Sequence, residues 1–213
     1  MNIKIHSLLN NQMRFRWDTI NNVSFNNGIY VVFEDGESYH GMDRIVRVGT
    51  HESDGRLLAR LKNHFISENK DGSIFRKNIG KAILKKVQNP YLEIWSKNSS
   101  NRRVMKNVIG YDSVLQRNIE SLVSEYMCNN LTFVCFPIET KIERLRLEEG
   151  IIALLNHSSD FSASSTWLGN YSPEAKIVNS GMWLKRGLKG RPLTEQEYEN
   201  IEMYCSDHEQ DVQ

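Results

Sequence analysis

An arginine and a histidine four residues apart are the first side chains in this sequence whose types and spacing could do chemistry. Arg60 and His64 lie in residues 57–65, where apolar residues recur at helical spacing. Residues four apart project from one side of a helix. A guanidinium there can bind a phosphate while an imidazole transfers a proton. A solvated helix face is the alternative interpretation.

Glu148 is the second candidate, in a helix that a capping box predicts for residues 140–156. At ~100° per residue, Glu148 falls inside the apolar stripe of that helix. An unpaired carboxylate is costly to desolvate, so the position favours a metal ion or a buried cation as its partner. A salt bridge to Arg144, one turn earlier, is the alternative. The stripe consists of Ile142, Leu145, Ile151, Ile152 and Leu155.

Three short apolar segments and four amphipathic segments must position these side chains. Residues 28–33 and 44–49 read as an antiparallel pair of strands, with a turn signal at Asp35-Gly36 between them. Residues 131–137 are the clearest strand. Helical periodicity predicts helices over 57–65, 73–87, 112–127 and 140–156. We therefore expect an α/β fold with a small three-stranded antiparallel sheet flanked by helices.

The remaining segments are expected to be extensions of this core. Residues 1–25 read as a polar N-terminal extension, residues 26–157 as the catalytic domain, and residues 158–213 as a C-terminal extension that packs on or near the active site. The polar and basic stretch 97–107 reads as a loop. A short helix is expected over residues 193–204.

Composition is ordinary for a soluble globular protein, with 213 residues, 39% of them hydrophobic and 25% charged. No apolar run approaches the roughly 18 residues of a membrane span, and no secretory signal is recognisable, so the sequence favours a cytoplasmic location. Three widely spaced cysteines predict neither a disulfide framework nor a zinc site.

The net charge of +1 is low for a protein that binds nucleic acid, because phosphate binding usually requires a basic excess. The charge is distributed unevenly, however. Basic residues gather in 76–86, 102–106 and 185–191, whereas residues 195–211 are acidic. Local basic surfaces therefore remain compatible with a nucleic-acid partner, although solvated charged faces also explain them.

Taken together, these residues resemble the GIY-YIG nuclease superfamily. The segment GIY at residues 28–30 opens the first strand, RVG at residues 47–49 ends the second, Arg60 and His64 follow in a helix, and Glu148 lies in the later helix. The resemblance covers roughly residues 28 to 156. The order of elements agrees with that fold as well as the motifs do.

The resemblance implies a role for each matching residue. Tyr30 would help to activate or orient the attacking water, and Arg60 would stabilise charge on the scissile phosphate. His64 would assist proton transfer directly or through Tyr30. Glu148 would hold one divalent cation, Mg²⁺ or another such as Mn²⁺, which suits a site made of one carboxylate, water and phosphate oxygens.

Two departures from the family pattern affect these roles. The second triplet begins with Arg47 instead of tyrosine, and a guanidinium binds phosphate but does not act as a phenol. Tyr39 is a candidate for a replacement hydroxyl. The family often has an asparagine after the glutamate, for which Asn170 is preferred over Asn156.

The function implied is a metal-dependent endonuclease that hydrolyses phosphodiester bonds in DNA, either restriction-type or structure-selective. Arg47, Arg76, Lys77 and Asn170 are expected to contact the nucleic acid. Cleavage of both strands would need a homodimer or two successive visits. One alternative is a nucleic-acid-binding module that has lost catalysis, which Arg47 motivates. Another is an interaction domain without a nucleic-acid role.

Overall fold

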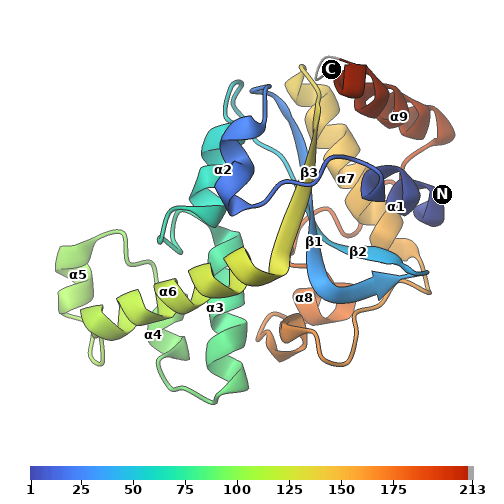
Figure 1. Ribbon diagram of the computed structural model, residues 1–213. Helices are drawn as coiled ribbons and strands as arrows, with labels where there is room; N and C mark the ends of the chain where they lie inside the picture. The colour runs from blue at the N-terminus through green and yellow to red at the C-terminus, as the bar shows by residue number, and fades with distance from the viewer. Residues whose placement is uncertain (211–213) are drawn as a thin grey trace.

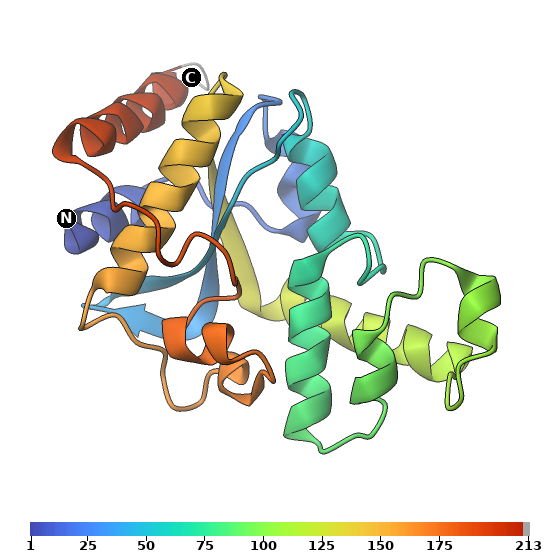
Figure 2. The same cartoon turned by 180° about the vertical axis from the view of Figure 1, so that it is seen from behind.

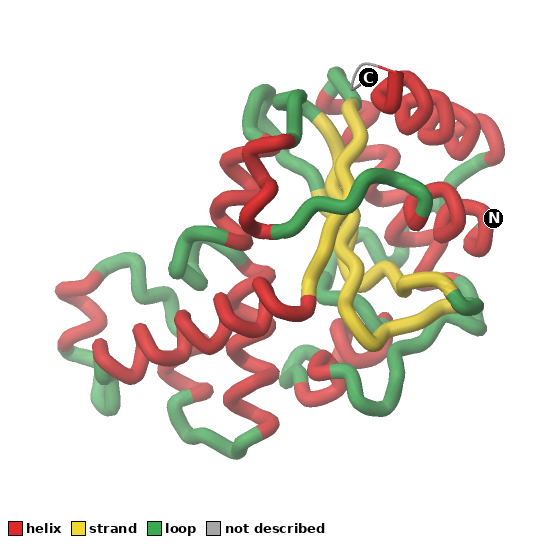
Figure 3. The backbone as a smooth tube through the Cα atoms, in the orientation of Figure 1, coloured by secondary structure: helices red, strands yellow, loops and turns green. Residues whose placement is uncertain are grey.

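A three-stranded antiparallel sheet forms the centre of the computed structural model, which describes residues 1–210 (Figures 1 and 3). The strands are β1 (Gly28–Tyr39), β2 (Met42–Gly49) and β3 (Leu131–Pro137), in the order β2-β1-β3. β1 is the central strand and pairs with both neighbours. The predicted fold class is confirmed, and all three predicted strands are present.

Helices cover both faces of the sheet. Along β1, Tyr30 and Val32 face one hydrophobic cluster, while Ile29, Val31 and Phe33 face another, as the two-residue period of a strand requires. The first cluster packs under α2 (Leu57–Phe65), α3 (Ile74–Lys86), α4 (Leu92–Ser96) and α6 (Ser113–Asn130). The second packs under α1 (Asn2–Asn10), α7 (Lys141–His157) and α9 (Glu195–Gln210).

The hairpin between β1 and β2 turns later than its sequence predicts. The turn expected at Asp35-Gly36 is instead an irregular stretch of β1, where the register with β2 shifts between Phe33 and Ser38. The chain reverses at His40 and Gly41, whose φ angles are 49° and 80°. Left-handed φ at both central residues is what a two-residue hairpin turn requires. Gly36, with φ of 80°, accommodates the irregularity instead.

Both terminal segments are more ordered than their composition indicates. Ile5 and Leu9 of α1 are fully buried against the sheet, and the 3-10 helix η1 (Trp17–Asn22) follows. Short helices that the sequence does not predict are α4, α5 (Arg102–Lys106), η2 (Leu168–Tyr171) and α8 (Ala175–Ser180). α5 replaces the loop expected at 97–107, because the Asn101 side chain caps its first backbone N–H groups.

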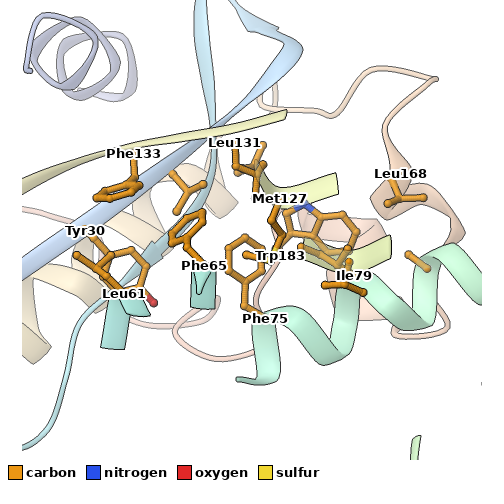
Figure 4. Close-up of a cluster of buried hydrophobic side chains, with 14 of the residues drawn as sticks. Tyr30, Leu61, Phe65, Phe75, Ile79, Met127, Leu131, Phe133, Leu168 and Trp183 are labelled. Atoms are coloured by element: carbon orange, nitrogen blue, oxygen red, sulfur yellow. The ribbon is translucent and has the colours of Figure 1, made fainter. Parts of the chain in front are cut away.

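Two tryptophans, one before η2 and one after α8, fix this part of the chain to the sheet. The indole Nε1 atoms of Trp167 and Trp183 donate to Oε2 of Glu34 over 2.9 Å and 2.8 Å. The backbone N–H of Trp183 also donates to the carbonyl of Val46 on β2 over 2.7 Å. Trp183 packs beside Phe75 and Ile79 of α3 in the same cluster as Tyr30 (Figure 4). The chain that follows then runs along α7 on its way to α9 (Figure 2).

No helix among residues 1–210 is long and apolar enough to cross a membrane.

Candidate active site

A cleft of about 1170 Å³ opens between α2, the end of β2 and α7. Arg47 from β2, Arg60 from α2 and Glu148 from α7 all line it. Lys185 and Arg186, in the segment that follows Trp183, line the same cleft. Residues from four separate parts of the chain therefore meet around one cavity.

Arg60 is presented to the cleft by one face of α2. Arg56 and Asn63, four residues before it and three after it, line the cleft as well, as the helical period requires. Arg60 is half-buried, and no carboxylate within the described part of the chain lies at ion-pair distance from it or from Arg56. Its guanidinium is thus unpaired and available to an anion.

His64 and Tyr30 lie behind the cleft wall, each with 0% exposure. The Tyr30 hydroxyl and His64 Nε2 are hydrogen-bonded over 2.8 Å, and His64 Nδ1 is 2.6 Å from Ser73 Oγ. Arg47 Nε donates to the Tyr30 oxygen over 3.4 Å. Because the Tyr30 oxygen accepts from Arg47, its own proton can be donated to His64 Nε2. His64 Nε2 must then be the unprotonated nitrogen, so the imidazole proton is assigned to Nδ1.

The His64 imidazole is neutral. Its complete burial and the nearby charges of Arg47, Arg60 and Arg76 hold its pKa well below the ordinary 6.5. A neutral ring can accept a hydrogen bond from Tyr30, which a protonated one cannot. Of the two routes expected for His64, this burial leaves the one through Tyr30, to which its Nε2 is hydrogen-bonded.

Gly49 allows Tyr30 to occupy this position. A Cβ atom at residue 49 would lie 2.2 Å from the Tyr30 hydroxyl oxygen and 2.3 Å from the ring carbon that bears it. The glycine that ends the second triplet therefore has a packing reason. Gly49 leaves room for the phenol of Tyr30 in the first triplet, and the two residues are register partners in the β1–β2 ladder.

Arg47 is held at the cleft by three contacts. One Nη atom donates to the carbonyl oxygen of Trp183, Nε donates to Tyr30, and the guanidinium lies 4.6 Å from the Phe75 ring centroid. Only 6% of the residue is exposed. A cation fixed in this way contributes positive potential to the cleft without the entropy cost of ordering a mobile side chain.

Glu148 lies at the cleft edge of α7 instead of within its buried face. The buried face is formed by Leu147, Ile151 and Leu155, whereas Ile142 is 84% exposed and Leu145 36% exposed. The predicted apolar stripe is therefore wrong at its N-terminal end. Because the helix is turned toward Leu147, Glu148 is half-buried beside the cavity.

The alternative interpretation of Glu148 as the partner of Arg144 is also wrong. Arg144 Nη2 pairs with Asp54 Oδ1 at 2.6 Å, and its Nη1 donates to the carbonyls of Ile138 and Glu139. Glu148 instead accepts from the backbone N–H of Thr50.

Burial raises the pKa of Glu148 to about 7, although the Thr50 hydrogen bond and the charges of Arg47 and Arg60 favour its ionised form. These partners therefore do not fully offset the cost of burying the ionised carboxylate, and a bound cation would stabilise it. Among residues 1–210, no group of three or more His, Cys, Asp or Glu side chains is arranged to hold a metal. A single carboxylate with water and phosphate oxygens fits Mg²⁺, which keeps several of its waters.

Two residues expected to contact nucleic acid are engaged inside the protein. Arg76 is fully buried, and its guanidinium pairs with Glu120 and donates to the backbone of His64. This expectation is corrected, because a desolvated arginine paired in this way cannot reach a phosphate. Lys77 Nζ lies 3.1 Å from Asp71 Oδ1, with its side chain 14% exposed.

The expected asparagine and the replacement tyrosine lie away from the cleft lining. Asn170 Nδ2 donates to the carbonyls of Ser164 and Ser165, and Asn156 Nδ2 donates to Leu188. Tyr39 donates to Asp160 Oδ2 over 2.9 Å at the far end of the hairpin. None of the three lines the cavity that holds Glu148.

Several residues that line the cleft were not predicted from the sequence. Arg56 and Asn63 were detectable, because they share the helical face of Arg60. Asn78 was detectable too, as a polar residue on the buried face of α3. Lys185 and Arg186 belong to a basic cluster in the sequence, but nothing local indicated which cavity they would line.

A family model described as the GIY-YIG domain matches residues 4–204. Searches of curated proteins and of solved structures found no match.

Proposed function

The chain belongs to the GIY-YIG domain family, and on this premise we propose that it is a Mg²⁺-dependent endonuclease that hydrolyses phosphodiester bonds in DNA. The family implies nuclease activity; the metal dependence and the residue roles are our proposal. One observation carries it, namely that Glu148 shares a cleft with Arg47 and Arg60, neither of which has a carboxylate partner at ion-pair distance in residues 1–210.

The scissile phosphate is proposed to bind between the two arginines and Glu148. Arg60 donates to its non-bridging oxygens and stabilises the charge that develops during attack by water. Arg47 adds a second positive charge, held in place by the Tyr30 oxygen and the Trp183 carbonyl. Glu148 would hold the divalent cation, which when bound would polarise a phosphoryl oxygen and stabilise negative charge on the leaving oxygen.

Tyr30 and His64 are proposed as positioning residues. Both are sealed from the cleft, and the Tyr30 oxygen accepts from Arg47 Nε. Neutral His64 orients the phenol, and Ser73 orients His64 in turn. Through this chain of hydrogen bonds the core fixes the direction of the Arg47 guanidinium, which must point at the phosphate to within a fraction of an ångström.

The cations around the cleft support a DNA substrate despite the net charge of +1. Arg56 and Arg186 are exposed and line the cleft, and Lys185 lines it while pairing with Glu174 at 3.1 Å. Such a surface neutralises backbone phosphates locally. We propose a restriction-type or structure-selective enzyme, in which one site cuts one strand and a second copy or a second visit cuts the other.

A plasmid-nicking assay tests the proposal. Supercoiled DNA is incubated with the protein in Mg²⁺ or in EDTA, beside Arg60→Ala, Glu148→Gln and the control Arg117→Ala. Arg117 is exposed on α6. We expect nicking only with Mg²⁺, a loss of about 10²–10³-fold for Arg60→Ala, and wild-type rates for Arg117→Ala. Nicking by Glu148→Gln at the wild-type rate would refute the site.

A second candidate function is a DNA-binding module that has lost catalysis. Arg47 at the position where the family triplet has tyrosine favours it. Such a module would bind DNA with strong salt dependence and would leave every plasmid uncut with any divalent cation. The same assay, with a binding measurement added, separates the two functions.

A further inference from the structure

A basic segment that follows Trp183 crosses α7 beside the cleft (Figure 2). We call residues 185–191 the basic strap, because four of its seven residues are cations: Lys185, Arg186, Lys189 and Arg191. Lys185 and Arg191 have carboxylate partners, whereas Arg186 and Lys189 are exposed. Within residues 1–210, no carboxylate lies at ion-pair distance from either of these two exposed cations. Both are therefore available to an anion.

The strap is anchored to the protein at its ends and in its middle. Leu184 and Leu193, which flank it, are each 7% exposed and belong to the hydrophobic cluster under α7. In the middle, Asn156 Nδ2 donates to the carbonyl of Leu188 over 2.9 Å. Near the C-terminal end, Arg146 donates to the last two backbone carbonyls before Leu193. These contacts fix the strap, so its backbone need not be ordered when a ligand binds.

Two glycines bring the strap directly onto α7. A Cβ atom at Gly187 would lie 3.1 Å from the nearest side-chain atom of that helix, and a Cβ atom at Gly190 would lie 2.4 Å from one. Gly187 also has a φ of 78°, which residues with a side chain rarely adopt. Arg186 and Lys189 each immediately precede one of these glycines. Each glycine packs on the helix while the cation before it is exposed, so the strap presents two charges to solvent beside the cleft.

The cleft beside the strap has a surplus of positive charge. Among residues 1–210, six cations and three carboxylates line it, whereas the whole chain has 27 and 26. The six cations are Arg47, Arg56, Arg60, Arg146, Lys185 and Arg186. Cations gathered in one cleft repel one another, and a polyanion that neutralises them removes this repulsion. A DNA strand carries one negative charge at each nucleotide, so it can neutralise cations along the whole wall.

The strap and α2 lie on opposite sides of the sheet. α2 packs on one face of the sheet, and α7, which carries the strap, packs on the other. Of the residues proposed to bind the scissile phosphate and its cation, Arg60 comes from α2 and Glu148 from α7. A DNA strand bound at these two residues therefore has Arg56 next to it on the α2 side and Arg186 next to it on the α7 side.

We propose that the basic strap binds, through Arg186 and Lys189, the backbone phosphates that flank the scissile phosphate on the α7 side of the cleft. The proposal rests on the proposed function and deepens it, because it names the element that holds the substrate beyond the cut. Phosphate contacts position DNA without reading its sequence. The strap therefore increases affinity for every sequence and leaves the rate of the chemical step unchanged.

DNA binding at varied salt concentration measures these contacts. The proteins carry Glu148→Gln and are kept in EDTA so that the DNA stays uncut, and retention of a duplex on a filter is followed from about 50 to about 200 mM salt. Arg186→Ala/Lys189→Ala is compared with the control Lys106→Ala/Arg117→Ala, which removes the same charge from exposed positions on α5 and α6. Loss of two phosphate contacts should lower the slope of log K against log salt by about 2, and the affinity at about 100 mM salt by roughly 10- to 60-fold. The control pair should keep the slope of the Glu148→Gln protein.

A charge-conserving pair of substitutions separates charge from side-chain shape. Arg186→Lys/Lys189→Arg exchanges the two cations and should retain the slope, because both phosphates still meet a positive charge. Nicking kinetics with Mg²⁺, measured without the Glu148 substitution, give a second readout. The alanine pair should raise KM and leave kcat within about 2-fold, since interactions made equally in the ground state and the transition state change KM alone.

Three results would overturn the proposal. One is an unchanged salt slope in the alanine pair. Another is an equal fall in the control pair, which would show that any lost surface charge weakens binding. The third is a fall in kcat with KM unchanged, because the strap would then act on the chemical step.

Failure of the proposed function has a different signature. If the wild type leaves DNA uncut with Mg²⁺ but the alanine pair lowers the salt slope, the nuclease assignment fails and the strap stands as a DNA-binding element. If the wild type nicks DNA and the alanine pair keeps the slope, the nuclease assignment stands and the strap proposal fails.

Discussion

Replacing Glu148 by glutamine should stabilise the protein at alkaline pH while removing its cation site. Burial raises the pKa of this carboxyl from the ordinary 4.5 to about 7. The folded state therefore holds the proton more tightly than the unfolded state. This contribution to stability is complete below pH 4.5 and is lost as the pH rises through about 7.

The difference between the two pKa values sets the size of the effect. At about 1.36 kcal/mol per pH unit, it amounts to about 3 kcal/mol of lost stability above pH 7. Because the carboxylate lies in an open cleft and is only half-buried, water and counterions reduce this, and we expect about 1–2 kcal/mol. For a chain of this length that corresponds to a melting temperature about 2–8 °C higher for Glu148→Gln.

Thermal melts of the wild type and Glu148→Gln in EDTA at pH 5 and pH 8.5 measure this difference in stability. At pH 5 the folded wild-type carboxyl is protonated and resembles glutamine, so the two melting temperatures should lie much closer together than at pH 8.5, where the variant should melt later. Mg²⁺ should then stabilise the wild type alone, because only its folded state binds the ion. Glu199→Gln, an exposed residue of α9, is the control. A Glu148→Gln protein that melts earlier than the wild type at pH 8.5 would refute the reasoning.

Three further predictions follow from contacts around the site. The Mg²⁺ concentration needed for half-maximal nicking should fall as the pH rises to about 7 and level off above it, because protons compete with the ion for Glu148; a titration at pH 6, 7 and 8 measures this. Gly49→Ala should lower stability by about 1–3 kcal/mol in urea unfolding and slow nicking, since its Cβ would meet the Tyr30 hydroxyl at 2.2 Å. Arg76→Ala should cost about 3–5 kcal/mol by leaving the buried Glu120 carboxylate without its ion-pair partner, while DNA affinity of the folded protein stays within about 2-fold in a filter-binding assay.

Local patterns predicted most of the elements but not every turn between them. The strands and the long helices follow from two-residue and 3.6-residue periods, which depend on residues close in sequence. The hairpin turn was misassigned because Asp35-Gly36 is a common turn dipeptide, while His40-Gly41 is not. What decides between them is the length over which β1 and β2 pair, and that is a tertiary property.

The same distinction separates the site residues that were predicted from those that were not. Glu148 was found because a carboxylate among apolar residues signals a special environment. Asn78 would have been found in the same way on α3. Arg76 was misread, because its partner Glu120 lies 44 positions along the chain and only the fold brings them together. A basic residue near a motif is thus weak evidence for phosphate contact until its partners are known.

Arg47 shows how a departure from the family triplet is accommodated. A guanidinium at this position needs acceptors and a surface to lie on, and it obtains them from the Trp183 carbonyl, the Tyr30 oxygen and the Phe75 ring. The first of these comes from the segment after α8, which also places Lys185 and Arg186 in the cleft. That segment is held in turn by Trp183 and Trp167 on Glu34. Since Arg47 depends on this support, and Lys185 and Arg186 line the same cleft, the segment after α8 forms part of the wall of the candidate site.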